Sequence, residues 1–321
     1  MTRYLLFISY IGTRFRGAQK QVVNAELTKS DPETVQGILE ICSKSFKPVN
    51  EPHVYISSRT DRGVHALCSS AHVDLERNGC LKYDPAHLTV AYNRYFINAN
   101  VDLRVQSVHI VPETFHARYS VKSRTYLYRL AVRNPDAPPL NKSSAYMAEI
   151  PFVEWNRCHF IQNVDKFDMS LLKAAATLFP GTRDFRTFMG QSAGNSHITT
   201  VKEMYKLDIS PGRPLIGAEY CSCCSHYSFW DITCQGRSFL YRQVRRMVGA
   251  LISVAEGHIS VGEIQYMLEN PSKHSWNSRI NVVPPYGLYL TKVEYDPLEM
   301  VMPQEKVEQD DNNNPIDFAE V

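Results

Sequence analysis

The alternation of hydrophobic and polar residues predicts the strands of the first third of the chain. Residues 3–10 and 103–111 alternate with a period of two, which is typical of a half-buried strand. Residues 53–57 and 71–75 are two short apolar runs separated by a polar corner at 59–63. We therefore expect four strands, two of them joined through this corner.

Two segments between these strands have apolar residues at spacings of three and four, which predicts amphipathic helices at 33–46 and 85–97. Pro85 fits the first turn of the second helix, because that turn needs no backbone donor at this position. The order strand–helix–strand–strand–helix–strand is that of a split βαβ unit. We assign this half to residues 1–111.

Residues 112–296 repeat this order with longer loops. We expect Ser238 or a neighbour to cap the longest helix and Gly257 to stop it, and Ser260 with Glu263 to form a capping box. The predicted fold class is α+β, with two ferredoxin-like halves whose antiparallel sheets form a central cleft. The pattern leaves open whether the two sheets join. The strands of this half are expected at 124–132, 201–209, 229–234 and 288–295, and the helices at 170–181, 238–257 and 260–270.

Composition separates the body of the chain from its end. Hydrophobic residues make up 44% and charged residues 21% of the 321 residues, which is typical of a soluble globular protein, and no apolar run approaches the ~20 residues that span a bilayer. Residues 297–321 hold seven acids and one lysine, which predicts an acidic disordered tail. The remaining 34 basic and 26 acidic side chains give a net charge of +8. Together with 18 Tyr and 14 Phe, this charge favours a polyanion that offers bases for stacking.

The eight cysteines stand at irregular spacing, and no signal peptide or Arg-rich transit peptide is visible at the N-terminus. We therefore expect an intracellular protein with reduced thiols. The cluster Cys221, Cys223, Cys224 and His226 has metal-ligand residue types, but structural zinc sites usually need two spaced pairs, and nearby there is only Cys234. We predict a polar loop there and no metal site.

The corner in "SSRTDRGVHA", residues 57–66, raises a choice between structure and chemistry. Asp and Gly are common turn residues, so Asp61 could simply cap a backbone amide. However, Arg59 and Arg62 flank this carboxylate, and they would favour its ionised form even if it were partly buried. Its place at a strand end would also give a catalytic group a rigid support.

The same stretch closely resembles the R-T-D-x-G-V-H-A signature of the TruA-type tRNA pseudouridine synthase family. "FHARYSVKSRTYLYRL", "GTRDFRTF", "FLYRQVRRMVGAL" and "PPYGLYL" match further motifs of the family in the same order, over residues 3 to about 295. Within this family, the residues of these motifs are most similar to those of the eukaryotic tRNA pseudouridine synthase-like 1 branch. The resemblance implies an enzyme that isomerises a uridine in RNA, with tRNA as the expected partner, without a metal or organic cofactor. It also suggests a possible homodimer, in mitochondria or the cytoplasm.

The resemblance assigns three catalytic residues. Asp61 would be the essential carboxylate, which can bond covalently to the ribose C1′, stabilise positive charge there, or remove a C2′ proton; the sequence does not choose among these routes. Tyr126 would stack on the target uracil and take up its C5 proton, although a tyrosine in such a strand is often a core residue. Arg245 would pair with Asp61, although most helix arginines lie on a solvated face. The small Gly249, one turn further on, would let another backbone segment approach closely.

Further residues are expected to bind substrate. The resemblance implies that the target uridine turns out of the RNA helix and that Arg59 moves into the space it leaves; Arg59 could also simply neutralise Asp61. Arg62 stands where the family commonly has Ala and adds positive charge beside Asp61, and Ser58 stands where Gly is common. Ala18 stands where many members have Trp, so the resemblance does not assign an RNA-facing role to the first loop. His65 is expected to bond to backbone and set the corner rather than to act as a base. The predicted substrate-binding set is Arg59, Arg62, His65, Arg118, Arg242, Arg246 and Leu288.

Two other functions are compatible with parts of this pattern. A non-catalytic RNA-binding protein or RNA chaperone would keep the fold but lose the Asp or Tyr, and both are present here. A carboxylate-based glycoside hydrolase would need a second acid beside Asp61, and these motifs contain none.

Overall fold

The computed structural model describes residues 1–23, 26–27, 31–138, 149–162, 166–191 and 198–302. Within these residues one sheet of ten strands has the order β6-β1-β5-β12-β7-β11-β10-β9, with β4 beside β5 and β8 beside β7. Its neighbours are mostly antiparallel, and β2 (Val22–Val23) and β3 (Glu26–Leu27) form a separate pair. The predicted α+β class is confirmed. The strands of the large sheet are β1 (Thr2–Tyr10), β4 (Val54–Ile56), β5 (His65–Leu75), β6 (Leu103–Val111), β7 (Val121–Arg133), β8 (His159–Ile161), β9 (Gly181–Asp184), β10 (Val201–Pro211), β11 (Tyr227–Gly236) and β12 (Leu288–Tyr295).

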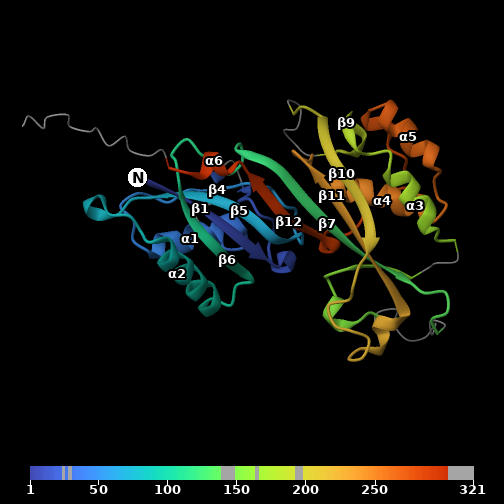
Figure 1. Cartoon of the computed structure of the whole chain (residues 1–321), viewed down its shortest axis with the longest axis horizontal. Helices are drawn as coiled ribbons and strands as arrows, with labels where there is room; N and C mark the ends of the chain where they lie inside the picture. Colours follow the sequence, from blue (N-terminus) through green and yellow to red (C-terminus); the bar gives the residue numbers. More distant parts are fainter. Residues whose placement is uncertain (24–25, 28–30, 139–148, 163–165, 192–197, 303–321) are drawn as a thin grey trace, which may run out of the picture.

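The helices lie in two groups along this sheet (Figure 1). α1 (Val35–Ser45) and α2 (Pro85–Asn98) accompany the N-terminal strands, whereas α3 (Met169–Ala176), α4 (Gln243–Ala255) and α5 (Val261–Glu269) gather at the other end. One contiguous hydrophobic core includes buried residues from both groups, such as Leu39 and Tyr92 in the first and Val248 and Leu251 in the second. The two halves are therefore packed on a common core.

Strand β12 joins the two halves into one sheet. It pairs in parallel with β5, with Tyr289 opposite His65, and antiparallel with β7, with Leu288 opposite Tyr128. The C-terminal strand thus lies between the strand that follows the polar corner and the strand that carries Tyr126. This pairing answers the question that the sequence pattern left open. The predicted domain boundary at residue 112 stays a prediction.

The longest helix begins later than predicted. α4 starts at Gln243 and not near Ser238, because Arg242 adopts a left-handed conformation with φ 57° that interrupts the helix. The Gln243 side chain instead accepts a hydrogen bond from the Leu240 amide at 2.8 Å. Gly257 follows the helix end with φ 70°, as expected for a stop signal. Arg242 is consequently presented from a tight turn ahead of the helix.

Local signals at the other helices agree with the structure. Ser260 and Glu263 form the predicted capping box of α5, and Pro85 occupies the first turn of α2. The first residues of the predicted tail instead form the short helix α6 (Pro297–Met300), whose Glu299 lies 3.2 Å from Lys122. The rest of that tail, residues 303–321, lies outside the described residues. None of the described helices is long and apolar enough to cross a membrane.

The cysteine cluster lies in and beside a short 3-10 helix, Ser222–His226. Cys221 and Cys223 are partly exposed, Cys224 is buried, and all three are free thiols. Across the described residues, no three His, Cys, Asp or Glu side chains are grouped so that they could hold a metal ion.

Candidate active site

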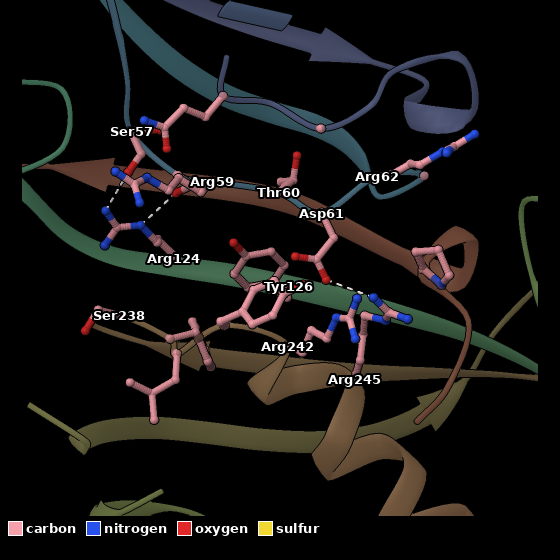
Figure 2. Close-up of a pocket in the computed structure, with 18 of the residues that line it drawn as sticks. Ser57, Arg59, Thr60, Asp61, Arg62, Arg124, Tyr126, Ser238, Arg242 and Arg245 are labelled. Carbon is pink, nitrogen blue, oxygen red and sulfur yellow. Dashed lines mark hydrogen bonds and ion pairs between the residues drawn. The ribbon is translucent and has the colours of Figure 1, made fainter. Parts of the chain in front are cut away.

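The polar corner between β4 and β5 presents Asp61 to an open cleft. The Val64 amide donates to the Asp61 carbonyl at 3.1 Å, and Gly63 has φ 81°, a conformation that favours glycine. Thr60 holds the corner in place through two hydrogen bonds. Its hydroxyl is 2.8 Å from the Tyr10 hydroxyl, and its carbonyl accepts from the Ala18 amide at 3.1 Å. The Asp61 side chain is thereby free to project away from the corner (Figure 2).

The carboxylate of Asp61 pairs with Arg245 of α4. Arg245 Nη1 is 2.8 Å from Asp61 Oδ2, and the two side chains are 11% and 19% exposed. Arg245 Nε also donates to the Val283 carbonyl at 2.9 Å. Arg245 is therefore held at two points. The alternatives raised by the sequence, that Arg245 lies on a solvated helix face and that Asp61 only caps a backbone amide, do not describe this ion pair.

The close approach expected at Gly249 is confirmed. A Cβ at this position would lie 2.2 Å from the Asn281 carbonyl oxygen, so residues 281–283 pass directly over the helix at this glycine. The same segment supplies the Val283 carbonyl that accepts from Arg245. Gly249 thus helps to set the position of Arg245.

Tyr126 on β7 lies in the same space as Asp61 (Figure 2). Its side chain is almost buried, and its ring meets that of Phe239 edge to face at 5.2 Å. Burial raises the pKa of Tyr126, and the charge of Asp61 adds to this shift, while Arg124 and Ser58 oppose it. Tyr126 is therefore a neutral phenol at physiological pH.

These three residues line a cleft of about 1020 Å³ that is strongly cationic. Among the described residues that line it, Asp61 is the one acidic side chain, against ten arginines and lysines. Arg16 and Lys20 pair with acids outside the cleft, at Asp31 and Glu40, and Arg245 pairs with Asp61. The wall therefore carries a surplus of positive charge. The cations are Arg16, Lys20, Arg59, Arg62, Arg118, Arg124, Lys202, Arg237, Arg242 and Arg245.

Arg59 and Arg62 both line the cleft, but they do not flank the carboxylate as the sequence suggested. They point in different directions, and both point away from Asp61 (Figure 2). The partner of Asp61 is Arg245, which comes from the other half of the chain. Burial lowers the pKa of Arg59, and the like charge of Arg118 adds to this effect.

The structure divides the remaining candidates between the cleft and the interior. Arg118 and Arg242 line the cleft, and Leu288 lines a smaller recess of about 60 Å³ that shares Asp61, Tyr126 and Arg245 with it. Arg246 instead lies 3.5 Å from the centre of the Trp276 ring and donates to the Thr187 carbonyl, away from the described cleft wall. Arg246 is thereby separated from the cleft-lining candidates, and its expected phosphate contact stays a prediction.

His65 is fully buried and does not line the cleft. Its Nδ1 accepts from the Gly12 amide at 3.0 Å, so its Nε2 donates to the Asn156 carbonyl, also at 3.0 Å. Burial lowers the pKa of His65 to about 4. The expectation that His65 bonds to backbone is confirmed, its role in setting the corner stays a prediction, and the structure separates it from the cleft-lining candidates.

Arg124 was not among the predicted site residues. Its guanidinium donates to the Ser58 hydroxyl at 2.7 Å and to the carbonyls of Ser57, Arg237 and Arg118 at 2.8, 2.7 and 3.3 Å. It therefore ties the Asp61 corner to two other segments of the cleft wall. Its position two residues before Tyr126 on one strand could have suggested this, since such residues share a face of the sheet.

Comparison with known proteins agrees with this geometry. A family model described as tRNA pseudouridine synthase matches residues 175–296. The chain is 34% identical over 299 residues to tRNA pseudouridine synthase-like 1 of Xenopus laevis, with 93% of each chain covered, and 35% identical to the Homo sapiens protein of that name, with 91% of this chain and 90% of the relative covered. It is 28% identical to tRNA pseudouridine synthase A of Brucella ovis over 92% of its length and 98% of the relative. The chain belongs to the tRNA pseudouridine synthase family.

Proposed function

We propose that this protein converts a specific uridine to pseudouridine within RNA, with tRNA as the substrate. The reaction conserves every atom: the bond between N1 and C1′ breaks, uracil turns, and C5 bonds to C1′. A proton leaves C5 and a proton is gained at N1. No redox step is involved, so side chains alone can supply the chemistry.

The observation that carries this proposal is the single acid among the described residues of the cleft. Asp61 faces Tyr126 and is held by Arg245, while nine further arginines and lysines line the surrounding wall. A carboxylate fixed by a guanidinium is ready to meet the positive charge that develops at C1′. The surplus positive charge on the wall is suited to RNA phosphates.

The burial of Tyr126 restricts its role in proton transfer. Because its phenol is neutral, Tyr126 can receive the C5 proton only while it passes its own hydroxyl proton to an acceptor such as the Asp61 carboxylate. The largely covered ring suits stacking on an extruded uracil. The attack on C1′, the stabilisation of charge there and the removal of a C2′ proton are all within the chemistry of Asp61.

The same observation argues against the other functions. Glycoside hydrolases of the two-carboxylate type need a second acid within about 5–10 Å, and among the described cleft residues Asp61 has no acidic neighbour. A purely RNA-binding protein would need the cationic wall but not the arrangement of Asp61, Arg245 and Tyr126.

Asp61→Asn is the sharpest test, because it keeps the shape of the side chain and removes its charge. We expect pseudouridine formation to be abolished while affinity for a tRNA transcript stays close to that of the wild type. Pseudouridines are mapped by chemical labelling and sequencing in cells with the wild type, the variant or neither. Unchanged turnover by Asp61→Asn would refute the catalytic role of Asp61.

Three further features are proposed on the resemblance. The N-terminal order β6-β1-β5, with β4 on β5, supports a ferredoxin-like first half. A homodimer is the expected oligomeric state, and light scattering measures it. A location in mitochondria or the cytoplasm is expected, and fractionation of cells measures it.

A further inference from the structure

Tyr119 is an exposed aromatic residue on the cleft wall that has no role in the chemistry above. It lies between β6 and β7, seven positions before Tyr126. Its side chain is 75% exposed, whereas Tyr126 is 8% exposed. An exposed ring that lines a cationic cleft needs an explanation, because large apolar surface is costly to leave in water.

The backbone that carries Tyr119 is held firmly. The amides of Tyr119 and Ser120 donate to the His116 carbonyl at 3.1 and 2.9 Å. The Ala117 amide donates to His72 Nδ1 at 3.1 Å, and its carbonyl accepts from the Tyr295 hydroxyl at 2.7 Å. The ring is therefore supported by a fixed loop, so a partner that binds it would lose little free energy in ordering the loop.

A second ring supports Tyr119 from within the loop. The His116 ring lies 4.4 Å from that of Tyr119 at 37°, and it meets the buried His72 ring at 4.7 Å. Burial lowers the pKa of both histidines, with a further contribution from Arg3, and that of His72 falls to about 4. Both imidazoles are thus neutral at pH 7, and Tyr119 belongs to an uncharged aromatic group.

Two arginine side chains line the cleft together with the Tyr119 ring. Arg118 Cζ lies 5.7 Å from the centre of the Tyr119 ring, and Arg59 lines the same cleft. Both arginines are exposed, and neither has an acidic partner among the described residues. A neutral aromatic ring beside exposed arginines is the arrangement with which proteins bind unpaired nucleotides, the ring stacking on a base and the arginines meeting phosphates.

We propose that Tyr119 is the stacking platform for an unpaired base that flanks the target uridine. This inference rests on the proposed function. Arg59 links the two places, because it stands two residues before Asp61 and lines the same cleft as Tyr119. When the target base turns into the space at Asp61, the neighbouring base on the Arg59 side comes within reach of the Tyr119 ring. Tyr119 thereby selects RNA in which that neighbour is not paired.

The test combines protein variants with modified RNA. A tRNA transcript that the wild type converts is prepared with its natural bases, or with an abasic residue on one or the other side of the target uridine. Dissociation constants are measured for the wild type, Tyr119→Ala and Tyr119→Phe. Tyr220→Ala is the matched control, since Tyr220 is 82% exposed and does not line the cleft.

We expect Tyr119→Ala to weaken binding of the natural RNA by about 5- to 100-fold. Tyr119→Phe keeps the ring and should bind as the wild type does, and so should Tyr220→Ala. On RNA that is abasic at the stacked position, Tyr119→Ala and wild type should bind equally. Equal affinity of Tyr119→Ala and wild type for the natural RNA would overturn the proposal, as would an equal loss with all three RNAs.

A second probe separates this inference from the proposed function. If the wild type converts no uridine in any tRNA, the proposed function fails, and the stacking is then measured without turnover. The probe is a short single-stranded RNA with one 2-aminopurine, whose fluorescence falls when it stacks. Quenching by the wild type and Tyr119→Phe, but not by Tyr119→Ala, supports the platform. The absence of a difference among them overturns it.

Discussion

Arg245 Nη1 contacts Asp61 Oδ2 at 2.8 Å, although the two residues are 184 positions apart in the chain. The contact joins the corner of the N-terminal half to a helix of the C-terminal half. The proposed catalytic group is therefore complete only when both halves have packed on the common sheet, and we expect the stability of the fold and the proposed activity to depend on the same pair.

Arg245→Met should therefore reduce both the stability of the fold and the rate of pseudouridine formation. The substitution leaves the Asp61 carboxylate and the Val283 carbonyl without their donor, so we expect the free energy of unfolding to fall by about 1–3 kcal/mol. The value of kcat should fall much more than the affinity for tRNA. Urea denaturation and single-turnover kinetics measure the two effects. Arg279→Met is the control, because Arg279 is 58% exposed and its pair with Glu263 should contribute at most about 1 kcal/mol. Full turnover by Arg245→Met would contradict the role of the pair.

Two glycine substitutions test the crossing at α4. In Gly249→Ala the new methyl group meets the Asn281 carbonyl oxygen at 2.2 Å, so residues 281–283 must move. We expect a loss of about 1–3 kcal/mol in the free energy of unfolding, with reduced kcat because Arg245 shifts as well. Gly262→Ala in α5 meets its nearest atom at 3.8 Å and should be neutral or stabilising by up to about 1 kcal/mol. Thermal unfolding of both variants shows whether the crossing is tight; equal stability of the two would contradict it.

Salt dependence tests the charge of the cleft. Five of its arginines are exposed, so we expect the logarithm of the binding constant for tRNA to fall with the logarithm of salt concentration with a slope of about −3 to −5. Arg242→Ala should make this slope shallower by about 1. Arg246→Ala should leave the slope unchanged, because Arg246 packs on Trp276. Filter binding at several salt concentrations measures this, and a slope that responds to Arg246 would place that residue on the RNA surface after all.

His65 makes the stability of the protein depend on pH. Burial lowers its pKa from 6.5 to about 4, so below pH 6.5 the unfolded chain takes up a proton that the folded protein does not. Its contribution to stability is full above pH 6.5 and is lost as the pH falls towards 4, which at pH 5 amounts to about 2 kcal/mol. Urea denaturation at pH 7.5 and pH 5 measures this loss. His65→Gln should show a smaller loss, whereas His87→Gln, whose histidine side chain is 91% exposed, should behave as the wild type.

Local signals in the sequence predicted most of the elements. The capping box at Ser260 and the proline at the start of α2 are interactions among close neighbours, so they can be read directly from the chain. The late start of α4 could not be predicted, because the left-handed conformation of Arg242 is not signalled by a glycine or asparagine. The short strands β8 and β9 were missed, since three or four residues give too little periodicity.

The candidate site was predicted in its chemistry but not in its geometry. The motifs identified Asp61, Tyr126 and Arg245, and all three line one cleft. The same motifs proposed Arg242 and Arg246 as phosphate contacts, yet Arg242 lies in a left-handed turn before α4, so the two do not share a helix face, and Arg246 packs on Trp276. Arg124 was missed because three of its four partners, Ser57, Ser58 and Arg237, come from segments far from it in the sequence.

The sequence by itself determined the residue types, the order of strands and helices, and the family to which the chain belongs, because motifs and short-range periodicity are properties of neighbouring residues. The tertiary structure alone decided that β12 joins the halves, that Arg59 and Arg62 point away from Asp61, and that His65 is buried. Such contacts depend on how distant segments pack, and burial in that packing fixes which charged groups meet.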